Sequence, residues 1–198
     1  MTAVYYNLIP ALWGIWLAYW YIAARDVKTT KQVESPWSRA GHAVPLAVAA
    51  WLLWPSRLPG NFLCQEILPW SDALYLVGAA CVAAGLGFAC WARYVLGRNW
   101  SGIVTVKEDH ELIRTGPYRF VRHPIYTGLL LGFIGTAIAR DEWRGVLAVV
   151  IVYIALWRKY RLEERWMIDN FGDAYRRFRS EVPALIPNPF RRTTVTPT

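Results

Sequence analysis

Apolar and polar segments alternate along this chain of 198 residues in a pattern that is typical of membrane-spanning helices. The first apolar stretch holds 21 residues without a charge. At about 1.5 Å per residue, such a helix reaches about 30 Å, the thickness of the hydrocarbon layer. The second apolar stretch is interrupted by Pro45. The last two apolar stretches are short, and they form either a helical hairpin through the bilayer or a segment that enters the bilayer and returns to the same side. Gly128 and Gly132 lie four apart and predict close helix packing. We predict an all-α integral membrane protein with about five transmembrane helices, in stretches 4–24, 41–54, 73–92, 124–139 and 145–157.

Lys and Arg residues divide the polar segments into two groups. Before, between and after the five stretches, the segments hold 0, 4, 1, 6, 2 and 9 of these residues. Cytoplasmic loops carry the excess of positive charge, so we expect the N-terminus outside and the C-terminus in the cytoplasm. Segments 93–123 and 158–198 then share the cytoplasmic side. No Lys or Arg precedes the first stretch, which therefore reads as a retained span of a plasma, inner or endoplasmic reticulum membrane, not a signal peptide.

The composition agrees with a membrane protein and excludes several other classes. Hydrophobic residues make up 55% of the chain and charged residues 18%, which is too apolar for an ordinary soluble domain. The net charge of +8 is explained by topology and anionic headgroups, and no motif indicates nucleic-acid binding. The three cysteines, Cys64, Cys81 and Cys90, have neither metal-ligand spacing nor a disulfide pattern. We expect no metal site.

Candidate chemistry begins at the fourth apolar stretch. Pro124 is favoured in the first turn of a helix, so His123 is expected near the cap and Tyr126 in the first turn, where backbone N–H groups face the cytoplasm. A purely structural reading is also open. In that reading, Arg122 and His123 anchor the helix at the interface, and Tyr126 belongs to the aromatic belt.

An acidic pair follows directly on the last apolar stretch. Glu163 and Glu164 lie on a helix expected over about 157–171, with Gly172 as its C-cap. Lys159 and Glu163 are four apart, so a solvated ion pair is the structural alternative.

Taken together, these elements resemble the isoprenylcysteine carboxyl methyltransferase family of integral-membrane enzymes. The resemblance covers roughly residues 93–187, whereas the N-terminal stretches match only in being apolar. It is carried by the segments 97–101 (GRNWS), 110–113 (HELI), 116–118 (GPY), 122–128 (RHPIYTG), 163–164 (EE), 171–175 (FGDAY) and 182–187 (VPALIP).

The resemblance implies S-adenosylmethionine as methyl donor and a lipophilic acceptor, most readily a prenylcysteine-like carboxylate. The family's acceptor-binding arginine falls near Lys159, with Arg158 beside it, and His123 is the base candidate for an amine or thiol acceptor. Lysine lacks the bidentate fork of arginine, so the carboxylate acceptor is in question. The implied donor-binding residues are His110, Glu111, Leu112, Ile113, Tyr118, His123, Pro124, Ile125, Tyr126 and Glu163.

The expected organisation is one membrane-embedded domain over 1–187 and a disordered tail over 188–198. Within the domain, 1–92 would supply N-terminal spans and 93–187 the catalytic part. The loop before His123 and the helix carrying Glu163 should fold together, bringing Tyr126 close to Glu163. Two other interpretations remain open, an NADPH-dependent membrane sterol or acyl reductase and a membrane scaffold without enzymatic activity.

Overall fold

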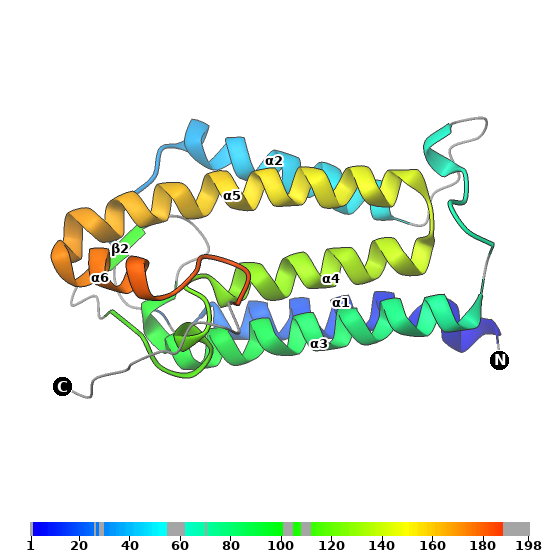
Figure 1. Cartoon of the computed structure of the whole chain (residues 1–198), viewed down its shortest axis with the longest axis horizontal. Coiled ribbons are helices and arrows are strands. Elements are labelled where there is room, and N and C mark those ends of the chain that lie inside the picture. The colour runs from blue at the N-terminus through cyan, green and yellow to red at the C-terminus, as the bar shows by residue number, and fades with distance from the viewer. Residues whose placement is uncertain are drawn as a thin grey trace.

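The computed structural model describes residues 2–25, 27, 30–54, 62–69, 71–100, 105–107 and 112–187. Its long helices run side by side along the longest dimension of the molecule (Figure 1). Helices α2 and α5 pack on each other, α1 and α4 both pack on α3, and α4 contacts α5. The helices are α1 (Thr2–Ala23), α2 (Pro36–Leu53), α3 (Asp72–Leu96), α4 (Pro124–Arg140), α5 (Trp143–Phe171) and α6 (Asp173–Glu181). Short 3-10 helices cover Phe62–Cys64, Gly97–Asn99 and Gly116–Arg119.

Every predicted apolar stretch falls on a helix, although 4–24 and 41–54 each extend one residue beyond its end. Helix α2 continues through Pro45, and α5 is one helix of 29 residues that joins the last apolar stretch to the segment predicted as a separate helix. Gly172 ends α5 with φ 53°, as predicted. Among the described residues, the helical segment Asp72–Asn99 is long and apolar enough to cross a membrane, and Pro124–Arg140 is apolar but shorter. The helical fold is therefore confirmed, whereas five membrane crossings stay a prediction.

A two-stranded antiparallel ribbon departs from the all-α expectation. Strand β1 (Thr30–Val33) pairs with β2 (Thr105–Lys107), and Val33 lies opposite Thr105. The ribbon joins the α1–α2 connection to the α3–α4 connection, and β2 also contacts α5. The ribbon thereby holds the start of α2 beside segment 93–123, which the sequence predicts to be cytoplasmic.

Glycines allow α3 and α4 to approach closely. A Cβ atom added to Gly128 would lie 2.4 Å from the carbonyl oxygen of Gly85, and one added to Gly135 would lie 2.5 Å from that of Gly78. A Cβ added to Gly85 would lie 2.8 Å from the backbone nitrogen of Gly132. The predicted close packing at Gly128 and Gly132 is confirmed. It fixes the position of α4, which begins after His123 and carries Tyr126 in its first turn.

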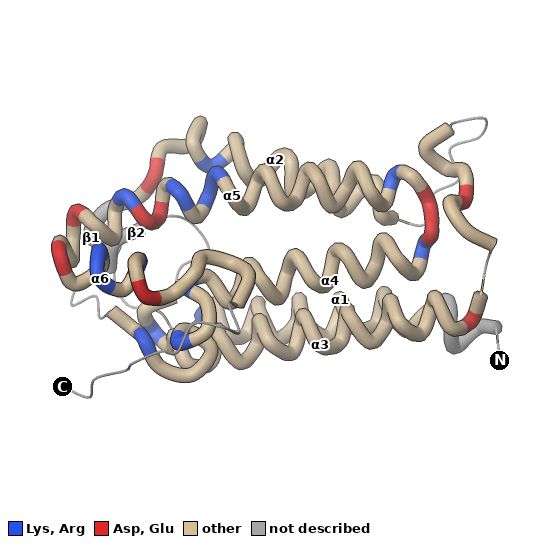
Figure 2. Tube along the Cα trace, viewed as in Figure 1, with Lys and Arg blue, Asp and Glu red and all other residues tan. Residues whose placement is uncertain are grey.

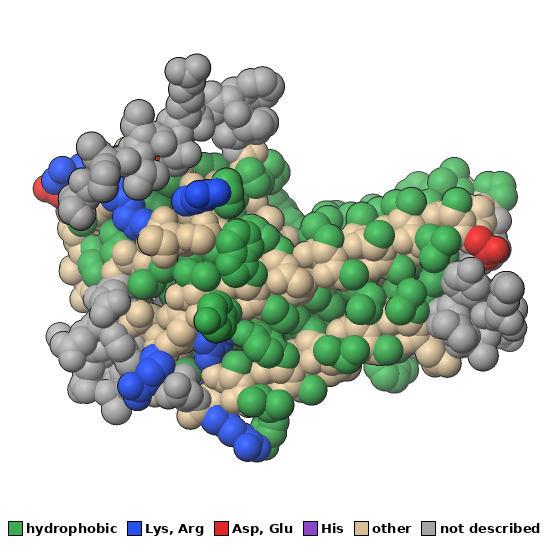
Figure 3. Space-filling model, turned by 90° about the horizontal axis from the view of Figure 1, so that it is seen from below, with side chains coloured by type: hydrophobic (Ala, Val, Ile, Leu, Met, Phe, Trp, Pro, Cys, Tyr) green, Lys and Arg blue, Asp and Glu red, His purple; other side chains and the backbone are tan. Residues whose placement is uncertain are grey.

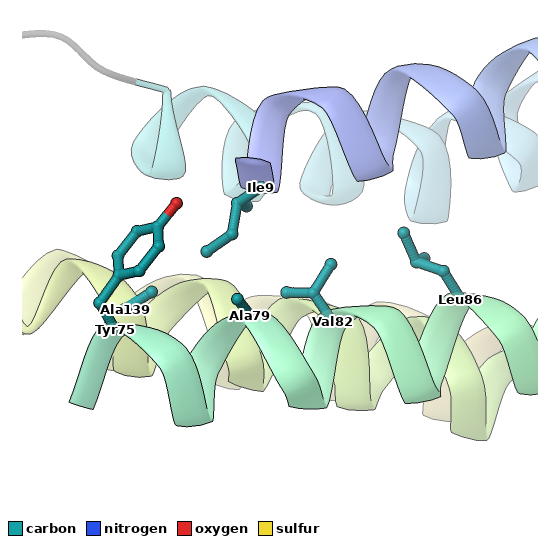
Figure 4. Close-up of a cluster of buried hydrophobic side chains, with 6 residues drawn as sticks. All are labelled: Ile9, Tyr75, Ala79, Val82, Leu86 and Ala139. Carbon is teal, nitrogen blue, oxygen red and sulfur yellow. The ribbon is translucent and has the colours of Figure 1, made fainter. Parts of the chain in front are cut away.

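Two apolar clusters fill the bundle interior. The first joins α1, α3 and α4, and Figure 4 shows Ile9 facing Ala79 and Val82. The second lies between α2 and α5 around Ala49, Val152 and Leu156. Large apolar side chains also face outward, among them Ile15 (68% exposed), Val77 (54%), Trp51 (55%) and Ile154 (56%). Figure 3 shows such side chains along the length of the bundle.

Charged residues gather at one end of the bundle, as Figure 2 shows around α6, β1 and β2. A smaller group lies at the turn between α4 and α5. There Asp141 adopts the left-handed conformation, with φ 51°, and accepts hydrogen bonds from the backbone of Ile67 and Leu68, both at 2.9 Å. Arg140 and Arg144 form ion pairs with Glu142 at the same turn. These contacts connect α4 and α5 as an antiparallel hairpin.

Candidate active site

The start of α4 is held by the C-terminal segment that folds back over it. The backbone N–H groups of Arg122 and His123 donate to the carbonyl oxygens of residues 183 and 184, at 2.9 and 3.0 Å. The Thr127 hydroxyl donates to the carbonyl oxygen of residue 185 at 2.7 Å. Pro124 occupies the first helical turn, and no side chain caps the helix. The segment therefore fixes the backbone that presents His123 and Tyr126.

A buried ion pair joins α4 to α5. The Nε and Nη2 atoms of Arg122 donate to Glu164 Oε1 at 2.8 and 2.5 Å, and the two side chains are 7% and 3% exposed. The same guanidinium donates to the carbonyl oxygens of Arg179, at 3.0 Å, and Val182. Burial by itself would raise the pKa of Glu164, but hydrogen bonds and charges from His123 and Arg122 outweigh it and lower this pKa to about 2. Glu164 is therefore ionised, and its contacts with Arg122 and His123 connect α5 to the start of α4.

His123 lies between the two carboxylates of α5. Its Nε2 is 3.3 Å from Glu164 Oε1, and its Nδ1 is 3.6 Å from Glu163 Oε2. Tyr126 stacks on the His123 ring, with centroids 5.5 Å apart, and donates its hydroxyl hydrogen to Glu163 Oε1 at 2.5 Å. The Glu163 side chain is 22% exposed, compared with 3% for Glu164. Glu163 is therefore the carboxylate that a ligand could meet.

Other predicted residues lie around this cluster. Tyr118 is buried and donates to the carbonyl oxygen of Ala92 at 3.4 Å. Burial, with a smaller effect from the Glu163 charge, raises the pKa of Tyr118, so its hydroxyl stays protonated. Ile113 and Ile125 pack in the same apolar cluster as Tyr118.

Some predicted donor-binding residues are only partly accounted for. Leu112 packs against Tyr175, Phe178 and Val182 under α6, adjoining the ion pair described above. His110 and Glu111 lie outside the described residues. The predicted binding role of the 110–113 segment stays a prediction.

Lys159 and Arg158 are neighbours in sequence but have different surroundings. Lys159 is 8% exposed, and its Nζ lies 5.3 Å from the centroid of the Tyr126 ring. The Arg158 guanidinium donates to the carbonyl oxygen of Ser38 at 2.9 Å and packs over Gly41, where an added Cβ would lie 2.7 Å from its Cζ. Successive helical residues differ by about 100° in direction, so only Lys159 faces Tyr126.

Sequence reasoning missed a second polar pair beside this site. His42 Nε2 lies 3.4 Å from Glu34 Oε1, and their side chains are 4% and 1% exposed. The charges of Lys159 and Glu163 both act on the His42 imidazole, and that of Glu34 acts on Tyr126. The signal that could have found it was a histidine inside an apolar stretch, because ionisable residues at such positions are rare and usually functional.

Comparisons with known proteins agree with the motifs. The sequence matches the phospholipid methyltransferase family over residues 73–174. It is 31% identical to the protein-S-isoprenylcysteine O-methyltransferase of Schizosaccharomyces pombe over 117 residues, which cover 52% of this chain and 48% of that protein. The mouse protein of the same name is 28% identical over 154 residues, covering 74% of this chain and 52% of the relative.

One further relative is named for a different substrate. Methanethiol S-methyltransferase 1 of Bradyrhizobium diazoefficiens is 41% identical over 70 residues, which cover 35% of this chain and 24% of the relative. This chain spans about half the length of the isoprenylcysteine methyltransferases it matches. The resemblance to those enzymes is confirmed. The matched segment includes the buried cluster of α4 and α5, and the chain belongs to the phospholipid methyltransferase family.

Proposed function

We propose that this protein is an integral-membrane methyltransferase that transfers a methyl group from S-adenosylmethionine to a lipophilic acceptor. The observation that carries the proposal is the buried cluster in which Arg122 and His123 meet Glu163 and Glu164 at the start of α4. Burying ionised groups costs free energy that apolar packing avoids, so such a cluster at the end of a bundle with apolar packing favours a functional role. The family supplies the class of reaction.

The chemical groups of the cluster fit the donor. S-adenosylmethionine carries a sulfonium cation, an ammonium group, a carboxylate and an adenosine. The partly exposed Glu163 suits its ammonium group or ribose, and the face of the Tyr126 ring attracts cations. The uncapped N-terminus of α4 offers backbone N–H groups to its carboxylate. We propose Leu112, Ile113 and Tyr118, with His110 and Glu111, around the adenine.

When bound, the donor supplies an electrophilic methyl group, and the residues of the chain align the acceptor with it. Pro124 and Ile125 fix the start of α4, and the two carboxylates fix the His123 ring. Alignment and exclusion of water are then the main sources of rate acceleration. We propose that Lys159 and His123 lie on the acceptor side of the site. Arg158 is not assigned to the acceptor, because its guanidinium donates to the carbonyl oxygen of Ser38 in α2.

The acceptor is proposed to arrive from the lipid. Outward-facing apolar side chains on α1, α2, α3 and α5 support contact with a bilayer. We propose five spans, with the N-terminus outside and the charged end of Figure 2 in the cytoplasm. The names of the yeast and mouse relatives favour a prenylcysteine carboxylate, which is therefore the first acceptor to try.

Ligand-dependent thermal unfolding of the purified protein in detergent tests the donor assignment. S-adenosylmethionine and S-adenosylhomocysteine should raise the unfolding midpoint, and NADPH should not. Glu163→Gln should abolish the shift, whereas Asp72→Asn, an exposed carboxylate at the start of α3, should keep it. Radiolabelled methyl transfer into N-acetyl-S-farnesylcysteine and a lipid extract then tests the reaction. Protection by NADPH alone would favour a reductase, and protection by none of these ligands would favour a scaffold.

A further inference from the structure

Glu34 and His42 form a buried polar pair that the proposed donor site does not use. Their facing atoms, Oε1 and Nε2, are 3.4 Å apart, and both side chains are almost fully excluded from solvent. In the part of the chain that the structure describes, His42 Nδ1 is buried and has no hydrogen-bond partner. Leaving a buried polar atom unsatisfied costs about 1–3 kcal/mol. A nitrogen kept in this state is a candidate for chemistry.

The geometry of the pair determines which nitrogen can accept a proton. A carboxylate only accepts hydrogen bonds, so the His42 nitrogen facing Glu34, Nε2, carries the hydrogen. Nδ1 then presents its lone pair in the neutral ring. A carboxylate that orients an imidazole in this way is the usual arrangement of a general base and its positioning residue.

The surroundings of His42 connect it to the acceptor side of the proposed site. From α5, the charges of Lys159, Arg158 and Glu163 act on the imidazole, together with that of Glu34. From α4, Tyr126 interacts electrostatically with Glu34. The Lys159 ammonium lies over the face of the Tyr126 ring. His42 therefore lies within electrostatic range of the buried Lys159 cation, and the residue before it, Gly41, packs against the Arg158 side chain of α5.

The chemistry of these groups fits a second class of acceptor, besides the carboxylate that the names of the relatives favour. A carboxylate has an unperturbed pKa of about 4 and needs no base, whereas a thiol, at about 8.5, must lose a proton before it attacks. An amine would become a cation during methylation, next to Lys159. A single ammonium stabilises a compact thiolate and lacks the fork that matches a carboxylate. We propose that His42, positioned by Glu34, deprotonates a lipophilic thiol, an inference that rests on the methyltransferase function proposed above.

The step balances without a further reactant. The S–H bond of the acceptor breaks, and its proton moves to His42 Nδ1. The thiolate sulfur forms a bond to the donor methyl carbon while the bond from that carbon to the sulfonium sulfur breaks. The products are a methyl thioether and neutral S-adenosylhomocysteine, and the imidazolium releases its proton to water.

Two probes with the same tail test the assignment, farnesyl thiol and N-acetyl-S-farnesylcysteine, in wild-type protein and His42→Gln. Loss of a general base costs about 100-fold or more. Methylation of the thiol by His42→Gln should fall by about that factor near neutral pH and recover as pH rises past the thiol pKa. Methylation of the carboxylate probe should change little. Asp72→Asn is the control for both. Equal loss with both probes, or a loss independent of pH, overturns the inference.

A direct measurement follows the proton. In the complex of wild-type protein with farnesyl thiol and S-adenosylhomocysteine, ultraviolet absorbance should show bound thiolate near neutral pH. In Glu34→Gln, the thiolate signal should be absent near neutral pH and should arise only at higher pH. Bound thiol without thiolate overturns the role of His42. If wild-type protein binds the donor but does not methylate the thiol, the inference is overturned and the proposed function stands. If wild-type protein does not bind the donor, both are overturned.

Discussion

The guanidinium of Arg122 and the carboxylate of Glu164 lie 42 positions apart in sequence and form an ion pair that is nearly closed to solvent. Arg122 lies two residues before α4 and Glu164 lies in α5, so the pair connects the start of α4 to the part of α5 that extends beyond its apolar stretch. Glu163, the residue before Glu164, is thereby held against Tyr126. Stability and ligand binding should depend on these neighbouring carboxylates in different ways.

Removing one partner of the buried pair should destabilise the protein strongly. Arg122→Met leaves Glu164 charged and buried, which costs about 3–5 kcal/mol. The free energy of unfolding in mixed detergent measures this loss. Arg176→Met is the matched control, because Arg176 pairs with Asp173 at the surface, where side chains are 62% and 78% exposed, and such pairs contribute at most about 1 kcal/mol. Equal losses in both variants would contradict the structural role of Arg122.

Acid should destabilise the fold through Glu164. Its folded-state pKa of about 2 lies below the ordinary value of 4.5, so the carboxylate stabilises the fold above pH 4.5. This contribution, about 3 kcal/mol, should be lost progressively as pH falls from about 4.5 through about 2. Unfolding midpoints measured across that range should fall less steeply in Glu164→Gln than in wild-type protein. Parallel curves would show that other groups cause the acid sensitivity.

The glycine contacts between α3 and α4 should tolerate no side chain. Gly128→Ala introduces a Cβ 2.4 Å from the backbone of Gly85, which forces the helices apart and costs about 1–3 kcal/mol or more. Because α4 carries His123 and Tyr126, donor binding should weaken as well. Gly87→Ala on α3 is the control, since nothing lies within 4 Å of the added atom, and it should stabilise the helix by up to about 1 kcal/mol. A neutral Gly128→Ala would contradict the packing.

Tyr126→Phe should separate ligand binding from folding. The variant keeps the ring that stacks on His123 but removes the hydroxyl that donates to Glu163. We expect a loss of affinity for S-adenosylhomocysteine of about tenfold to a hundredfold, since a hydrogen bond to a charged group contributes about 1.5–3 kcal/mol. Titration calorimetry measures this loss. Tyr153→Phe, at an exposed position of α5, should bind like wild-type protein. Unchanged affinity in Tyr126→Phe would contradict a donor-binding role for Glu163.

The local elements were predictable because their signals are local. Pro124 marks the first turn of α4, and Gly172 ends α5 with a positive φ. The apolar stretches predicted each long helix, and the expected approach of Tyr126 to Glu163 is confirmed by a hydrogen bond of 2.5 Å. That contact was expected from family motifs.

Contacts between distant segments were not predictable in the same way. The strands of the ribbon are three and four residues long, too short for a periodic signal, and they lie far apart in the chain. Without that pairing, nothing in the sequence indicates that Glu34 and His42 adjoin α5. Arg158 and Lys159 were predicted together because they are adjacent, but only the packing of α2 on α5 shows which one faces Tyr126.

The fold-back of residues 183–185 onto α4 has a consequence for biosynthesis. Their carbonyl oxygens accept hydrogen bonds from Arg122, His123 and Thr127, which are synthesised some sixty residues earlier. The long helices all precede this segment in the chain, so they are synthesised before it. The cluster that we assign to methyl transfer becomes complete only afterwards, so a chain truncated before residue 182 should retain the long helices but be inactive.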